Sequence, residues 1–243
     1  MTKHKTKTTP VYDVVADGDG FALHRDGRFL MTPAGLAFRV PTLDLANQIA
    51  EEWRAQGEKI LPATMPMTQL AATAFDIVAK DRAKIVRGLT GYATSELLCH
   101  FAQEPEALTE KQRVAWQPYL DWCAQRYNAH FVTGCGVMPI RQNPDTVPTL
   151  TAVIDAFDDF SLAGLSSATD STGSLVLGLA LAEGFTTAQD IFHASVLDTL
   201  HQAIRWGDDP VTIARHTSIQ KDLEACEKWF ALLRQDAATT DTV

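Results

Sequence analysis

The sequence predicts an α+β fold in which a small N-terminal antiparallel sheet with a covering helix precedes a C-terminal all-helical domain. Two observations support this prediction. β-compatible runs separated by turn signals fill residues 10–41, and apolar residues at helical spacing fill most of the chain that follows. We expect a domain boundary at residue 94, which gives an N-terminal α/β domain over 1–94 and a helical domain over 95–243.

Four β-compatible runs occupy residues 10–41. Asp17–Gly20 and Asp26-Gly27 separate the first three runs, and Pro33–Gly35 precedes the last. Asp-Gly favours tight hairpin turns because both central residues of such turns adopt positive φ. The runs therefore predict a small antiparallel meander.

The first helix is expected over residues 42–56, beginning at Thr42 and ending before Gly57. Its apolar residues recur at helical spacing, and they are Leu45, Ile49 and Trp53. This stripe predicts a helix that packs on one face of the sheet.

A second helical region spans residues 67–89, with an expected break near Lys80-Asp81. Residues 96–101 are interpreted as a short returning strand. Residues 106–127 have a helical pattern in which Pro118 either starts a second helix or kinks one, because proline lacks a backbone donor.

Five further helices are predicted, at residues 146–157, 159–170, 172–183, 187–205 and 210–234. The helix at 172–183 is apolar on all sides and contains Gly178. Such a pattern indicates a helix buried in a bundle.

The segment 187–210 is the most informative stretch of the chain. Its polar stripe has spacings of three and four and consists of Asp198, His201, Gln202 and Arg205. The opposite stripe is expected to pack and consists of Phe192, Val196, Leu200 and Ile204. Trp206 and Gly207 end the helix, since glycine favours the left-handed backbone of helix ends. From the residues alone, the polar stripe fits either a solvated helix face or a recognition surface.

Composition argues against several classes of function. The 243-residue chain has a net charge of -9 and a pI near 5.2, so nucleic acid or an acidic membrane surface would be repelled. The only basic cluster lies in residues 3–7, and the longest apolar run, 175–182, is far shorter than the roughly 20 residues of a membrane span. The four scattered cysteines are typical of free thiols in a reducing cytoplasm.

No catalytic, cofactor or metal site is predicted. Residues 18–20 lack the following helix that a dinucleotide fingerprint requires, and there is no phosphate-binding loop motif. The sequence around His193 and His201 shows no further residues at the spacing of metal ligands, so the two histidines predict no metal site. Cys99 and His100 are adjacent in an expected strand, so their side chains point to opposite faces and form no nucleophile–base pair.

Short segments between about residues 20 and 210 match, in the same order, segments of one known protein family. They are Asp26–Arg28 with Thr32-Pro33, Ala50–Trp53 with Pro66–Thr68, Leu97–Cys99, Trp116 with Pro118 and Asp121-Trp122, Thr172–Ser174, and Arg205–Gly207. Together they resemble the assembly-chaperone family that serves the alpha subunit of the catalytic head of F-type ATP synthase, a mitochondrial family with bacterial relatives. The ordered set carries the resemblance, since no single motif decides it.

The resemblance implies a non-enzymatic role, in which the protein binds the free alpha subunit and masks its beta-facing interface until assembly. Masking an apolar interface lowers the amount of aggregation-prone subunit. It also implies a monomer that caps one subunit. The expected location is the bacterial cytoplasm, because the N-terminal residues contain no presequence-like segment. For eukaryotic relatives the resemblance implies the mitochondrial matrix.

The resemblance also suggests site residues. Counting back from Trp206, Asp198 matches the family's acidic position. The predicted partner-binding residues are Asp198, His201, Gln202, Arg205 and Trp206, and the predicted structural residues are Trp53 and Gly207.

Two other classes of function stay open at this point. One is an enzyme of unknown chemistry with its site between the two domains, where clefts are common. It predicts ionisable groups of strongly perturbed pKa that converge in a pocket. The other is an inert structural subunit of a larger complex.

Overall fold

The computed structural model describes residues 10–136, 138–207 and 209–234. Its contacts divide the chain into two compact units, one comprising Met1–Asp76 with Ala231–Val243 and the other Ile77–Phe230. We call them the N-terminal unit and the helical unit. The sequence predicted a boundary at residue 94, whereas this division places residues 77–94 with the helical unit.

The sheet of the N-terminal unit is antiparallel throughout. Its strands are β1 (Tyr12–Asp17), β2 (Gly20–Arg25), β3 (Arg28–Phe29) and β4 (Arg39–Val40), and β2 pairs with each of the other three. The turn between β2 and β3 has positive φ at both central residues, 52° at Asp26 and 75° at Gly27. This confirms the predicted antiparallel sheet and its Asp-Gly hairpin. The fourth run departs from a simple meander, because β4 pairs with β2 and not with β3.

Helix α1 (Leu43–Arg54) packs on this sheet through contacts with β1, β2 and β4. Leu45 and Ile49, two residues of the predicted stripe, are fully buried. The Thr42 hydroxyl accepts a hydrogen bond from the Leu45 backbone N–H and so caps the helix start. The predicted covering helix is therefore confirmed.

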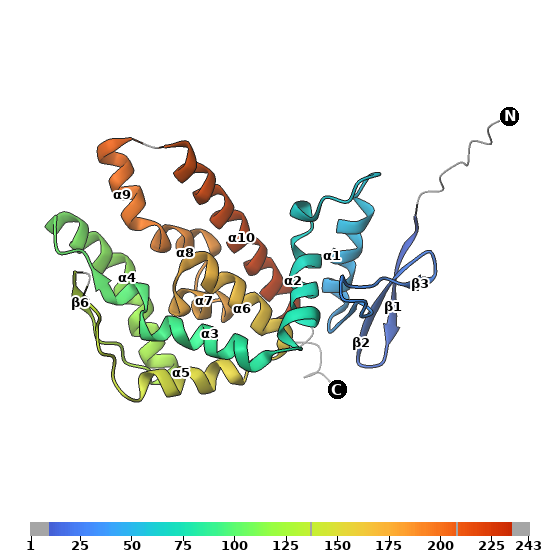
Figure 1. The fold of residues 1–243 in the computed structure, drawn as a ribbon, viewed down its shortest axis with the longest axis horizontal. Helices are drawn as coiled ribbons and strands as arrows, with labels where there is room; N and C mark the ends of the chain where they lie inside the picture. The colour runs from blue at the N-terminus through green and yellow to red at the C-terminus, as the bar shows by residue number, and fades with distance from the viewer. Residues whose placement is uncertain (1–9, 137, 208, 235–243) are drawn as a thin grey trace. The chain divides into compact units, whose positions relative to one another are not determined.

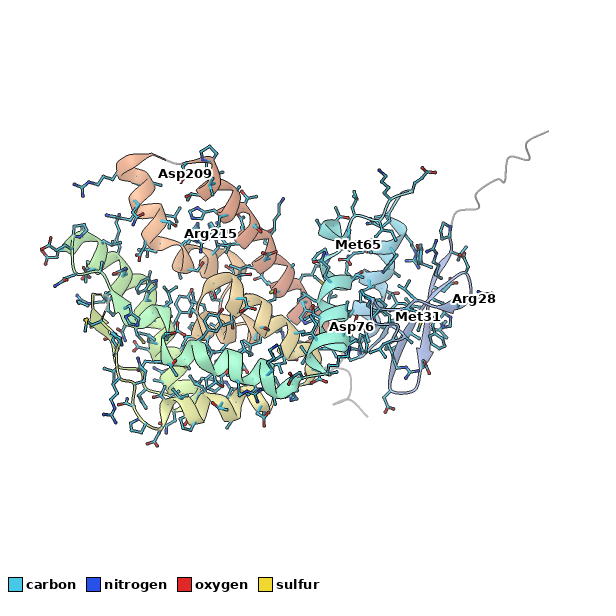
Figure 2. All side chains as sticks on the ribbon, viewed as in Figure 1. Arg28, Met31, Met65, Asp76, Asp209 and Arg215 are labelled. Carbon is cyan, nitrogen blue, oxygen red and sulfur yellow. The ribbon has the colours of Figure 1, made fainter. Side chains whose placement is uncertain are left out.

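The region predicted as helical over residues 67–89 contains three elements. Helix α2 (Pro66–Thr73) continues into a π-helix (Ala74–Val78), and α3 (Arg82–Thr94) begins after the predicted break. Asp76, labelled in Figure 2, lies in the π-helix, and its carboxylate accepts hydrogen bonds from the Thr32 hydroxyl and the Ala34 backbone N–H.

The N-terminal unit also contains the end of the last helix, α10 (Pro210–Arg234). The Thr42 hydroxyl donates a hydrogen bond of 2.9 Å to the Leu232 carbonyl. Thus one threonine both caps α1 and contacts the final turn of α10. Segments from opposite ends of the sequence together build this unit.

The helical unit is shown in Figure 1 from green to red. After α3 its elements are a 3-10 turn (Leu97–Cys99), β5 (His100–Phe101), α4 (Glu106–Tyr127), β6 (Gly134–Cys135), α5 (Thr146–Asp155), α6 (Asp159–Thr172), α7 (Leu175–Ala182), α8 (Ala188–Ser195), α9 (Leu197–Trp206) and most of α10. The returning strand expected at 96–101 is thus reduced to two residues, which pair in parallel with β6. Helix α4 continues through Pro118.

Helix α7 lies at the centre of this unit and contacts α3, α4, α6 and α8. All seven residues from Leu175 to Leu181 are buried, as the all-apolar pattern predicted. The close approach of α6 depends on Gly178, because a β-carbon there would lie 2.5 Å from the Thr169 hydroxyl oxygen. The small residue therefore sets the spacing between α6 and α7.

A buried carboxylate caps α7. Glu96 is completely buried and accepts hydrogen bonds from the Ser174 hydroxyl and from the backbone N–H groups of Leu175 and Val176. Burial raises its pKa to about 7, and these hydrogen bonds oppose the rise.

Candidate functional site

The helix predicted over residues 187–205 is broken in the structure. Helix α8 ends at Ser195 and α9 begins at Leu197, with Val196 between them at φ -109° and ψ 13°. The Ala194 carbonyl accepts a hydrogen bond of 2.9 Å from the Trp116 indole of α4. The prediction of one continuous helix was therefore wrong, because a tertiary donor binds a carbonyl near the break.

The apolar stripe predicted for this segment is buried before the break and more exposed after it. Phe192 and Val196 are buried as predicted, and Leu200 is half-buried. Ile204 is 81% exposed, so the prediction that it packs was wrong. No described side chain of α9 is buried, although its polar and apolar residues are more sharply segregated than in any other helix assigned in the described residues. The apolar side of α9 is thus only partly covered, and Ile204 lacks the packing that its place in the sequence pattern would normally give it.

Asp198 lies in the first turn of α9 and is half-buried. Its Oδ1 accepts a hydrogen bond of 2.7 Å from the Gln112 side-chain amide of α4. Among the residues that the structure describes, Asp198 forms no ion pair and its Oδ2 accepts no hydrogen bond. A partly desolvated carboxylate is thereby held in one orientation with one oxygen available.

The other residues of the predicted polar stripe lie along a cleft of about 570 Å³. His201, Gln202 and Arg205 line it from α9. Glu104 and Pro105, which precede α4, and Leu108 in its first turn line it as well. Gly207, Asp209 and Thr212 line it from the turn into α10 and the first residues of that helix. Figure 2 labels Asp209 at the start of α10 and Arg215 further along the same helix.

Asp198 lines two other clefts. One also contains Glu104 and residues 100–103 after the 3-10 turn, and the other contains Arg215 and His216 of α10. The Thr199 hydroxyl and the His216 Nε2 are 2.8 Å apart, so the first turn of α9 is joined to α10 as well as to α4. The structure therefore separates Asp198 from the cleft that holds the rest of the polar stripe.

The turn from α9 to α10 exposes several apolar side chains. Ile204 is joined there by Val211 at 79% and Ile213 at 51% exposure. Large apolar side chains at such exposure within ten residues of sequence suggest an interaction surface. We call Ile204, Val211 and Ile213 the apolar tip.

The remaining predicted residues are placed as follows. Gly207 has φ 84° and follows the last turn of α9. The side chain of Trp206 lies outside the described residues. Trp53 is half-buried at the end of α1, with its ring centroid 5.8 Å from that of Tyr12. Its contacts are those of a packing residue.

The described residues bear on metal binding and on the reactivity of two buried thiols. They contain no group of three or more His, Cys, Asp or Glu residues that could hold a metal ion. Burial raises the pKa of Cys99 and of Cys123 to about 12, which keeps both thiols protonated and unreactive at neutral pH. Within the same residues no helix is both long and apolar enough to cross a membrane.

The sequence reasoning missed Gln112 and the hydrogen bond of Trp116. Gln112 is only 1% exposed and lies one turn from Leu108 and one turn from Trp116, both buried. A polar residue on the buried stripe of a helix was the available signal, because buried amides occur where partners satisfy them.

Comparison with known proteins identifies the family. The family model described as ATP12 chaperone protein matches residues 5–124. Two structures of Atp12 from Paracoccus denitrificans, one of them an aspartate-to-lysine mutant, are 34% identical with TM-scores of 0.88, and the match covers 91% of this chain and 94% and 95% of theirs. The chain belongs to the ATP12 chaperone family. A protein from Agrobacterium tumefaciens is also similar, at 32% identity and a TM-score of 0.86, over 91% of this chain and 84% of that one.

Membership of the ATP12 family confirms the resemblance stated from the sequence. The structural match covers 91% of this chain, whereas the family model covers its first half. The family is one of chaperones.

Proposed function

We propose that this chaperone of ATP synthase assembly binds the free alpha subunit of the catalytic head, and that α9 with the apolar tip is its client-binding surface. The observation that carries the proposal is the exposure of Ile204, at the end of the apolar side of a strongly amphipathic helix, together with Val211 and Ile213 just beyond it. Unassembled subunits expose interfaces whose centres are more apolar than ordinary surface. An apolar helix face and an apolar subunit interface bury each other on binding.

Asp198 supplies specificity in this proposal. Its Oδ2 is available, and the larger of the two clefts that it lines, with a volume of about 810 Å³, has room for a partner side chain. An arginine or lysine of the client would form a charge-assisted hydrogen bond there, stronger than one between neutral groups. The cleft with residues 100–104 contains a second carboxylate, Glu104, and its lining has neither lysine nor arginine among the residues that the structure describes. Client binding at this point therefore favours a cationic side chain.

The test uses the isolated alpha subunit without its beta partner. The full-length chaperone is expected to keep the alpha subunit in solution and to release it when the beta subunit is added. If the alpha subunit precipitates equally with and without the chaperone, the proposed client is wrong.

Asp198→Asn tests the site separately. Asparagine retains an acceptor for the Gln112 amide, so the thermal midpoint should stay unchanged, while loss of the charge should weaken alpha-subunit binding at least about tenfold. Asp145→Asn is the matched control, because Asp145 is exposed at the start of α5 and far from α9 in sequence. Equal binding by wild type and Asp198→Asn would remove Asp198 from the site without affecting the assignment of the client.

A further inference from the structure

Gln112 is a buried polar side chain that joins three segments of the helical unit. It lies on α4 and is 1% exposed. Its Oε1 accepts a hydrogen bond of 2.7 Å from the Ala102 backbone N–H, and its Nε2 donates one of 2.7 Å to Asp198 Oδ1. The side chain thereby connects the residue that follows β5 with the first turn of α9.

The chemistry of the two partners fixes the orientation of the Gln112 amide. A backbone N–H only donates, so the carboxamide oxygen must face Ala102, and a carboxylate accepts, so the NH₂ group must face Asp198. The donor that reaches Asp198 is neutral and brings no positive charge to the carboxylate. Gln112 thus orients Asp198 without forming an ion pair with it.

Trp116, one turn further along α4, contacts the connection between α8 and α9. Its indole N–H donates to the Ala194 carbonyl, at the end of α8, while Gln112 holds the start of α9. Both side chains are at most 1% exposed. Two buried donors on one face of α4 therefore fix the place where α9 leaves the bundle.

We propose that Gln112 is a positioning residue for client binding, which holds the Asp198 carboxylate and the first turn of α9 in the orientation that the client recognises. The inference rests on the proposed function. Gln112 is too buried to touch a client, so it acts through Asp198. Holding the carboxylate in place before binding removes the cost of ordering it in the complex.

A double-mutant cycle tests this role. The dissociation constant of the alpha-subunit complex is measured for wild type, Gln112→Leu, Asp198→Ala and the double variant. Gln112→Leu should weaken binding about tenfold in wild type and less than about twofold when Asp198 is already alanine. Equal weakening in both backgrounds, or none in wild type, would overturn the proposal.

Gln117→Leu is the matched control, since it is the same substitution at an exposed position of α4. It should leave binding unchanged. Hydrogen exchange of the α9 amides in the chaperone alone supplies a readout that needs no client. Gln112→Leu should accelerate that exchange several-fold more than Gln117→Leu, and equal rates would also contradict the proposal.

These outcomes separate the two levels of inference. If wild type fails to bind the alpha subunit, the proposed function is wrong whatever the exchange data show. If wild type binds and Asp198→Ala binds equally well, the site is wrong. If wild type binds, Asp198→Ala binds more weakly and the cycle shows no coupling, only the role of Gln112 is wrong.

Discussion

Glu52 caps helix α2 through Thr68. The Glu52 carboxylate accepts hydrogen bonds of 2.8 Å from the backbone N–H groups of Met67 and Thr68, and one of 2.7 Å from the Thr68 hydroxyl. Glu96 caps α7 through Ser174 in the same way. Each unit therefore has a helix whose N-terminal N–H groups are satisfied by a buried glutamate from an earlier segment.

Glu52→Ala is expected to destabilise the protein by about 2–3 kcal/mol, because it leaves buried donors of α2 unpaired. Urea unfolding gives the free energy difference. Glu51→Ala is the control, as Glu51 is exposed in the same turn of α1. A change no larger than that of the control would show that the cap contributes nothing to stability.

Glu96 should make stability depend on pH. Its pKa in the folded protein, about 7, lies above the ordinary 4.5, so the folded state binds the proton more tightly than the unfolded state. The resulting stabilisation is fully present below about pH 4.5 and is lost as pH rises through about 7, and it amounts to up to roughly 3 kcal/mol.

The measurement for Glu96 compares the free energy of unfolding of wild type with that of Glu96→Gln from pH 4.5 to 8. As pH rises, the free energy of unfolding of wild type should fall relative to that of Glu96→Gln, and the change should level off toward pH 8. Glu106→Gln, at an exposed site in α4, should show no such trend. A difference independent of pH would contradict the prediction.

Gly178→Ala should destabilise the helical unit by about 1–3 kcal/mol, since the added methyl would overlap the Thr169 side chain and force α6 and α7 apart. Gly88→Ala is the matched control in α3, where a β-carbon would meet nothing within 4 Å. Better helix propensity should stabilise that variant by about 0.5–1 kcal/mol. Thermal or urea unfolding should therefore give opposite signs for the two substitutions.

Ile204→Ser tests the apolar tip. Because Ile204 is 81% exposed, stability should change by no more than about 0.5 kcal/mol. Affinity for the alpha subunit should fall about tenfold, as expected when an apolar side chain buried in a complex is truncated. Val114→Ser, at 69% exposure on α4, should change neither quantity. Unchanged affinity of Ile204→Ser in a titration would place the client elsewhere.

Much of the fold could be predicted because local chemistry determines it. Asp26-Gly27 has the positive φ values that its composition demands, and Thr42 caps α1 where the sequence placed the helix start. The all-apolar segment around Gly178 is the buried centre of the bundle. For the hairpin and the helix cap the decisive interaction lies within a few residues of sequence, and for α7 the all-apolar composition is itself the signal of burial.

The site was harder to predict because its decisive contacts are distant in sequence. The break at Val196 has no proline or glycine to announce it, and it coincides with the hydrogen bond from Trp116, 78 positions away from Ala194. The break also explains why helical periodicity gave the wrong burial for Ile204. Periodicity identifies an apolar side of a helix but not whether another element lies against it.

The contact between Thr42 and Leu232 has a consequence for protein synthesis. The ribosome releases the sheet and α1 early, yet the segment that completes their unit emerges only after the whole helical unit. The N-terminal unit can therefore reach its final packing only after α10 has been synthesised. Shortening the chain at its C-terminus should damage the first-made unit, even though its own strands and helix remain intact.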